Sequence, residues 1–120
     1  MYGVPKNLPL QRFVGDSICQ IAFGLHEIQF HFNRAGTISV EGEWQIYDSS
    51  GKIVDESIDE NALPSSRLDY KFHVILEGEV TKFELNVPDS FTLIFSSGYR
   101  LKIFNHENYT VSIHPGNWIF

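Results

Sequence analysis

The clearest pattern of hydrophobic and polar positions in this chain has a period of two residues, which is typical of strands that bury one face. Early in the chain, apolar Ile28, Phe30 and Phe32 alternate with polar residues. After the turn "NRAGT" the alternation resumes, and its inward positions are Ile38, Val40, Gly42, Trp44 and Ile46. The two runs predict a β-hairpin. "DSSG" at 48–51 predicts a turn that leads into a short return strand at 52–55.

The same pattern returns late in the chain. Phe91, Leu93 and Phe95 alternate, and after the turn "SSGYR" the apolar positions Leu101 and Ile103 begin a return strand. Four pairs of residues are separated by 63 positions: Phe30 and Leu93, Phe32 and Phe95, Ile38 and Leu101, and Val40 and Ile103. A separation of 65 relates Trp44 to Tyr109, Ile46 to Val111, and residues 51–54 to 116–119. One register thus relates the two hairpins.

The correspondence extends upstream, where "LQRFVGDSICQIAF" resembles "FHVILEGEVTKFEL". In the first segment Ile18 and Ile21 are three positions apart, and in the second Val80 and Phe83 have the same spacing. Strict alternation is therefore broken at the same place in both segments. This shared irregularity predicts a β-bulge or a strand start in each.

These registers predict an internal repeat, with copies at about 7–54 and 70–120 of a single domain that spans residues 1–120. A meander of this length cannot bury its own apolar face, so the copies should pack around an approximate twofold axis. We predict a mainly β fold, a sandwich or partly closed barrel with one or two short helices, and an α+β fold is the alternative. Chance registers in an all-β chain are the competing explanation of the repeat.

The segment between the copies begins with the polar stretch "DESIDENALPSS", which predicts a surface loop. Leu68, Phe72, Ile75 and Leu76 follow with helical spacing, and a serine before them would cap a helix start. A helix of about ten residues within 66–77 is therefore one prediction. "VILEGEV" also fits a strand, which stays as the alternative.

Composition narrows the class of protein. Hydrophobic residues make up 42% of the 120 residues and charged residues 20%, which indicates a folded domain rather than a disordered chain. A net charge of −6 and a pI near 5.2 repel phosphate groups, so we expect no nucleic-acid partner. No apolar run is long enough for a signal peptide or a membrane span, and Cys19 is the single cysteine. We therefore expect a cytoplasmic protein that is not bound to membranes.

Six segments carry a family resemblance: "LQRFVGDSI", "EIQFHF", "GEWQIYDSSGKIVD", "LEGEV", "FTLIFSSGYRLKI" and "YTVSI". In these segments the chain resembles a family of small bacterial proteins that carries only a domain-of-unknown-function label. The resemblance implies a stand-alone bacterial domain. Its residues are framework positions, so it implies no catalytic residue.

Five histidines raise the question of a metal site: His26, His31, His73, His106 and His114. None has the spacing of a known ligand motif. His31 could meet His106 or His114 across neighbouring strands, where side chains approach closely. Solvated imidazoles on an outer face are the simpler interpretation, so we predict no metal and no cofactor.

Glu41, Glu43 and Glu107 are the carboxylates that would complete such a metal site. Glu41 and Glu43 would also share one strand face about 7 Å apart, a separation that suits acid–base chemistry. The same spacing occurs on any solvated strand, so we predict no catalytic pair. Cys19 has the parity of the apolar Ile21, and we expect it in the core rather than as a nucleophile.

An outer apolar patch is the remaining feature. Phe104, Ile94, Tyr47 and Tyr99 have the parity opposite to the core, and the chain-end "NWIF" could join them. Such a patch predicts a homodimer. For function we predict a non-catalytic binding or interaction protein, such as an immunity-type partner of a basic protein. A small-ligand binder or enzyme with its site in the groove between the repeats is the alternative.

Overall fold

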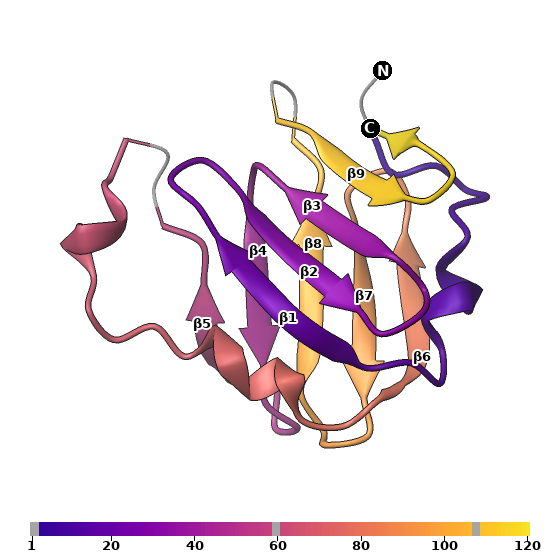
Figure 1. The fold of residues 1–120 in the computed structure, drawn as a ribbon, viewed down its shortest axis with the longest axis horizontal. Helices are drawn as coiled ribbons and strands as arrows, with labels where there is room; N and C mark the ends of the chain where they lie inside the picture. The colour runs from indigo at the N-terminus through magenta and orange to yellow at the C-terminus, as the bar shows by residue number, and fades with distance from the viewer. Residues whose placement is uncertain (1–2, 59–60, 107–108) are drawn as a thin grey trace.

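Ten strands form two antiparallel five-stranded sheets, packed face to face, in the computed structural model, which describes residues 3–58, 61–106 and 109–120 (Figure 1). We call the sheet with strand order β1-β2-β3-β9-β10 sheet A and the sheet with order β5-β4-β8-β7-β6 sheet B. In Figure 1 the strands of sheet A run diagonally across the upright strands of sheet B. The predicted mainly β fold is confirmed, as a sandwich rather than a closed barrel.

All elements are short, and the helical segments of the described residues are 3₁₀ turns. Sheet A contains β1 (Ile18–Phe23), β2 (Ile28–Phe32), β3 (Thr37–Val40), β9 (Val111–His114) and β10 (Trp118–Ile119). Sheet B contains β4 (Trp44–Tyr47), β5 (Ile53–Glu56), β6 (Val80–Asn86), β7 (Ser90–Phe95) and β8 (Arg100–Phe104). The 3₁₀ turns are η1 (Leu10–Phe13), η2 (Pro64–Ser66) and η3 (Phe72–Leu76).

Each sheet takes three strands from one half of the chain and two from the other. The meanders β1-β2-β3 and β6-β7-β8 supply the larger parts, and the chain crosses to the opposite sheet after β3 and again after β8. Consequently β9 pairs with β3, and β4 pairs with β8. Strands β1 to β5 of the first half correspond in order to β6 to β10 of the second half. When each strand of sheet A is replaced by its counterpart, the result is the strand order of sheet B, read in the opposite direction. A sequence duplication as the origin of this symmetry stays a prediction.

In both halves of the chain, the alternation of inward and outward side chains is interrupted at the position that the sequence predicts. The register shifts between Ile18 and Gln20 in β1, and between Val80 and Lys82 in β6. One extra residue in each shift allows the next apolar side chain of the strand to pack against the core. The predicted bulges are confirmed.

The predicted equivalence of Trp44 and Tyr109 is wrong. Trp44 pairs with Ile103 in sheet B, and Val40 pairs with Val111 in sheet A. Val40 and Ile103 are equivalent residues of the two halves, 63 positions apart. Their partners are Val111 and Trp44, so Val111 is the residue equivalent to Trp44. The crossover before β9 is longer than the one before β4, so Tyr109 lies outside the strand.

Within 66–77, the predicted helix of about ten residues is reduced to the 3₁₀ turn η3 (Phe72–Leu76), in which Ile75 is buried. The alternative strand is wrong, because β6 begins only at Val80, the last residue of "VILEGEV". Leu68, which would lie on the buried face of the helix, is 92% exposed. Asp55 of β5 instead accepts a hydrogen bond from the backbone N–H of Lys71 at 2.6 Å and forms an ion pair with Arg67. These tertiary contacts hold the segment against β5 and override its helical spacing.

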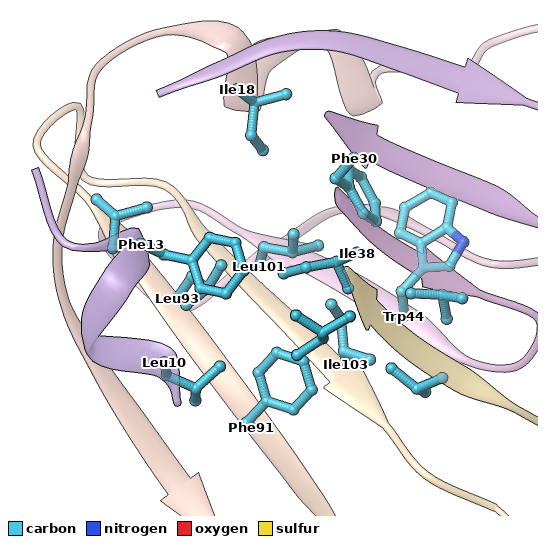
Figure 2. Close-up of a cluster of buried hydrophobic side chains, with 14 of the residues drawn as sticks. Leu10, Phe13, Ile18, Phe30, Ile38, Trp44, Phe91, Leu93, Leu101 and Ile103 are labelled. Carbon is cyan, nitrogen blue, oxygen red and sulfur yellow. The ribbon is translucent and has the colours of Figure 1, made fainter. Parts of the chain in front are cut away.

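The core between the sheets contains apolar side chains from both halves of the chain (Figure 2). Phe30 and Ile38 reach it from sheet A, and Leu93 reaches it from sheet B. The turn η1 adds Phe13, whose ring centroid lies 4.7 Å from that of Phe32. The 3₁₀ turn thus completes the packing at the side of the sandwich.

Two predicted environments are wrong. Cys19 is exposed rather than buried, because it lies in the bulge of β1, where the parity of the strand changes. Ile94 lies outside the core cluster but is only 7% exposed. Its partners in the neighbouring strands are Lys82 and Arg100, and long side chains of this kind cover apolar neighbours on a sheet face. Of the other residues of the predicted patch, Tyr47 and Phe104 are half-buried, Tyr99 packs against the core, and Phe120 of the chain end belongs to the core at 5% exposure.

Candidate functional site

A groove opens at the end of the sandwich where the chain crosses between the sheets. Its lining comes from the β1–β2 turn, the β3–β4 crossover, the segment after β5 and the end of the β8–β9 crossover. These turns lie at the upper end of the molecule in Figure 1. The groove has two adjoining parts of about 520 and 530 Å³, which share Glu41, Gly42 and Tyr109 among their lining residues. Both halves of the chain therefore contribute to one site.

The first part of the groove is lined by apolar and polar residues together, and it contains most of the apolar side chains that line the groove. Its floor contains the buried side chains of Ile28, Val40 and Trp44. Phe23 and Leu25 line its side and are 37% and 56% exposed. The ring of Phe23 is held by Tyr70 and Phe72, with centroid distances of 5.0 and 5.1 Å. This part offers a fixed apolar surface that a bound side chain would remove from water.

The second part of the groove is acidic, since Glu41, Glu43 and Glu56 line it together with His106. Oε1 of Glu41 accepts a hydrogen bond from the backbone N–H of Thr110 at 3.0 Å. Oε1 of Glu43 lies 2.6 Å from Nε2 of His106. Each of these two contacts orients one carboxylate in the groove.

Tyr47, on the neighbouring strand β4, responds to this concentration of charge. Burial raises the pKa of Tyr47, and the charges of Glu43 and Glu56 raise it further. Both carboxylates therefore disfavour a negative charge in their vicinity. The same field would stabilise a bound cation.

Gly42 allows the two crossovers to touch. A Cβ at this position would lie 3.0 Å from the Cβ of Tyr109, which is closer than side chains normally approach. A larger residue would displace Tyr109.

A buried carboxylate anchors the segment 67–71, which follows the groove-lining residues Asn61 and Ala62 in the sequence. Asp55 is 2% exposed and pairs with Arg67, and it also accepts the hydrogen bond from Lys71. The guanidinium of Arg67 lies over the ring of Tyr70, 4.5 Å from its centroid. Burial alone would lower the pKa of Arg67, but the hydrogen bond and charge of Asp55, together with Asp69, raise it. The ion pair thus fixes this segment against β5.

The histidines do not converge on one site. His31 and His114 are both partners of Thr37, so a whole strand separates them. The others are spread over the molecule: His26 lines the first part of the groove, His106 lines the second part, and His73 lies on η3. In the part of the chain that the structure describes, no three metal-ligating side chains come together. Glu107 lies outside the described residues.

The structure brings Glu41 and Glu43 together, but on the β3–β4 crossover rather than on one strand face. Strand β3 ends at Val40, so Gly42 is a crossover residue and not an inward strand position. Sequence reasoning missed Glu56 as a third carboxylate. No local pattern relates it to the other two, because β5 and the crossover meet only through the pairing of strands.

No protein-family model, no curated protein and no solved structure matches this chain. The groove is therefore interpreted from its own geometry. Across residues 3–58, 61–106 and 109–120, no helix has the length and apolar character needed to span a membrane.

Proposed function

We propose that the protein is a non-catalytic binding protein whose groove receives a cationic segment of a basic protein partner. The observation that carries this proposal is the acidic part of the groove, which Glu41, Glu43 and Glu56 line together. Carboxylates accept charge-assisted hydrogen bonds from Lys and Arg side chains. The net charge of −6 adds a long-range attraction that speeds the encounter with a basic partner.

The way in which the carboxylates are held supports binding rather than catalysis. Glu41 is exposed, and the side chain of Glu43 is 39% exposed. An acid–base pair of carboxyl groups needs one member in apolar surroundings, where it stays protonated at neutral pH. Exposed carboxylates at an open mouth suit the recognition of a cation instead.

A second function, the binding of a small cationic ligand, is supported by the size of the groove. A volume of about 520 Å³ lies within the range of small-molecule sites. The groove also lies where the crossovers of the two halves meet. The same carboxylates would select for a positive charge, so this function, with or without chemistry on the ligand, is the alternative.

The proposal extends to the cellular context. A bacterial cytoplasmic protein of the immunity type would combine an acidic surface with a basic partner, and the negative charge disfavours nucleic acid as that partner. The single cysteine suits a reducing compartment. Two copies would meet on the outer face of sheet B, where Tyr47 and Phe104 are half-buried.

A titration followed by NMR tests the proposed function. The probe is a Lys- and Arg-containing decapeptide without aromatic residues, at an ionic strength of about 0.05 M and again at about 0.5 M. We expect salt-sensitive shifts in the amides of residues 41–43 and 56–58. The double variant Glu41→Gln/Glu43→Gln should lose most of this binding.

The control is the double variant Glu77→Gln/Glu84→Gln, which changes the net charge equally on exposed residues outside the groove. It should bind almost as the unaltered protein does. Equal weakening by both double variants, or no binding at all, would show that the groove does not recognise basic segments. An alkylamine that binds as tightly as the peptide would favour the small-ligand alternative.

A further inference from the structure

We infer that the groove receives an extended segment of the partner, which places one aliphatic side chain between the β1–β2 turn and the β3–β4 crossover. The other half of the chain receives the protein's own N-terminal segment in this way. The inference rests on the proposed function and names the kind of segment that binds. It follows from a comparison of two equivalent places in the two halves, of which one is filled and the other is open.

The groove has a structural equivalent in the second half of the chain. Ile28 of β2 pairs with Val40 of β3, and both residues line the groove. Phe91 of β7 pairs with Ile103 of β8 in the same register, 63 positions further along the chain. The β6–β7 turn and the β8–β9 crossover follow these strands as the β1–β2 turn and the β3–β4 crossover follow theirs. The space between that turn and that crossover is therefore the equivalent of the groove.

Gly3 and Val4 occupy this equivalent space. The backbone N–H of Val4 donates a hydrogen bond to the carbonyl oxygen of Pro88, in the β6–β7 turn, at 2.8 Å. The backbone N–H of Gly3 donates to Oδ1 of Asn105, the first residue of the β8–β9 crossover. Val4 is 2% exposed and belongs to the core cluster. In Figure 1 the N-terminal segment lies at the upper end of the molecule, on the side opposite to the β1–β2 turn.

In the first half, the chain leaves the corresponding space open. Residues 66–71 lie 63 positions after 3–8, so they correspond in sequence to the N-terminal segment. They take a different path, because Asp55 holds Arg67 in an ion pair, and this part of the described chain lies outside the groove lining. Leu25 of the β1–β2 turn consequently remains 56% exposed at the side of the groove. A segment of another molecule can take the vacant place.

Val4 shows which kind of segment suits such a place. Pro5 follows it, and a residue before proline is restricted to an extended conformation, so a Val–Pro pair loses little conformational freedom on binding. A second copy of this chain is a poor source of the segment, because its own fold already buries Val4. We therefore assign the groove to a segment of a different protein, with Val or Ile before Pro.

An NMR titration with a heptapeptide tests the inference. The probe is Gly-Val-Pro-Lys-Asn-Leu-Pro, the sequence of residues 3–9, with both ends blocked. An ionic strength of about 0.5 M screens the attraction between charges. We expect saturable shifts in the amides of Leu25, His26 and Gly42. A matched peptide with Ser in place of Val should bind about tenfold more weakly, because it buries less apolar surface.

Variants of the protein and the location of the shifts assign the peptide to the groove. Leu25→Ser should weaken binding of the Val peptide several-fold, because this leucine lies at the exposed side of the groove. The control Leu68→Ser changes a leucine that is 92% exposed and outside the lining, and it should leave the affinity unchanged. Shifts at Asp89 and Asn105 instead of the groove would mean that the peptide displaces the N-terminal segment, which would overturn the assignment.

The remaining outcomes separate this inference from the proposed function. Equal affinity for the Val and Ser peptides, or no saturable shift with either, would overturn the inference even if the basic decapeptide binds. Failure of the decapeptide, with the heptapeptide bound in the groove, would instead remove the proposed selection of a basic partner and leave the inference standing.

Discussion

Phe32 and Phe95 occupy equivalent places in the two sheets. Phe32 pairs with Ile18 at the edge of sheet A, and Phe95 pairs with Val80 at the edge of sheet B. In both hairpins the register shift follows directly after this pair, and both rings are buried, at 6% and 2% exposure. The same local arrangement therefore occurs once in each half of the chain.

Removal of either ring should destabilise the fold by a similar amount. We expect Phe32→Ala and Phe95→Ala each to reduce the free energy of unfolding by about 3–5 kcal/mol, because a large buried ring leaves a cavity. Chemical denaturation measures this. His31→Ala, next in sequence to Phe32 but half-buried on the outer face, should stay within about 1 kcal/mol. If either Phe→Ala variant lost less than about 1 kcal/mol, the result would contradict the burial of both rings in one shared core.

The ion pair of Asp55 and Arg67 should contribute more than an exposed pair. Asp55→Ala removes the acceptor of Arg67 and of the Lys71 amide, and we expect a loss of about 2–3 kcal/mol, less than for a fully buried pair because Arg67 is 29% exposed. Asp69, also paired with Arg67 but 77% exposed, is the matched control. Asp69→Ala should change the free energy of unfolding by less than about 0.5 kcal/mol. Equal losses in urea denaturation would mean that burial of Asp55 is unimportant.

Gly36 should tolerate no side chain. Its φ is +117°, and a Cβ would lie 1.8 Å from the carbonyl oxygen of His114, at the junction of β3 and β9. Gly36→Ala should therefore cost more than about 3 kcal/mol. Gly51 has a φ of +89° and nothing within 4 Å of the Cβ position, so Gly51→Ala should show backbone strain alone, about 1–2 kcal/mol. Thermal unfolding that ranks the two variants equally would argue against the close approach of β9.

Asp16 should make the stability depend on acid pH. Burial alone would raise its pKa, but the backbone N–H groups of Arg34, Ala35 and Ser17, helped by the charge of Arg34, lower the pKa overall. The stabilisation is therefore present above the unfolded value of about 3.9 and is lost as the pH falls through the lower folded pKa. Asp16→Asn should lower the free energy of unfolding at neutral pH. In a plot of this free energy against pH, it should also flatten the acid limb, where the stability falls with pH. Exposed Asp89→Asn should leave that limb unchanged, and identical curves for the two variants would refute the assignment.

Cys19 should react in the folded protein. Its side chain is exposed and its Sγ lies 3.4 Å from the carbonyl oxygen of His31, so no unfolding is needed for access. A thiol reagent should label it in the native state, before any denaturant is added. Cys19→Ala should change the stability by less than about 1 kcal/mol. Labelling only after addition of denaturant would place the thiol in the core.

The candidate site could be predicted from the sequence only in part. Glu41 and Glu43 are singled out by their spacing, and the idea of a groove between the two halves follows from the repeated pattern. The position of Phe23 in the groove could not be predicted, because Phe23 comes from β1 and its ring is held by a segment that follows β5. The spacing that predicted a helix in that segment gave no indication of the Asp55 anchor.

The sequence by itself determined most of the strands, most of their apolar faces and the place of both bulges, since these depend on the spacing of neighbouring residues along the chain. It did not determine the exposure of Cys19 or the end of β3 before Gly42. The tertiary structure decided that β4 and β9 cross to the opposite sheets, that Val111 rather than Tyr109 corresponds to Trp44, and that Leu68 is exposed. It also brought Glu56 to the carboxylates of the crossover. These features depend on the length of the crossovers and on contacts between distant residues, and local hydrophobic periodicity is the same whichever strand becomes the partner.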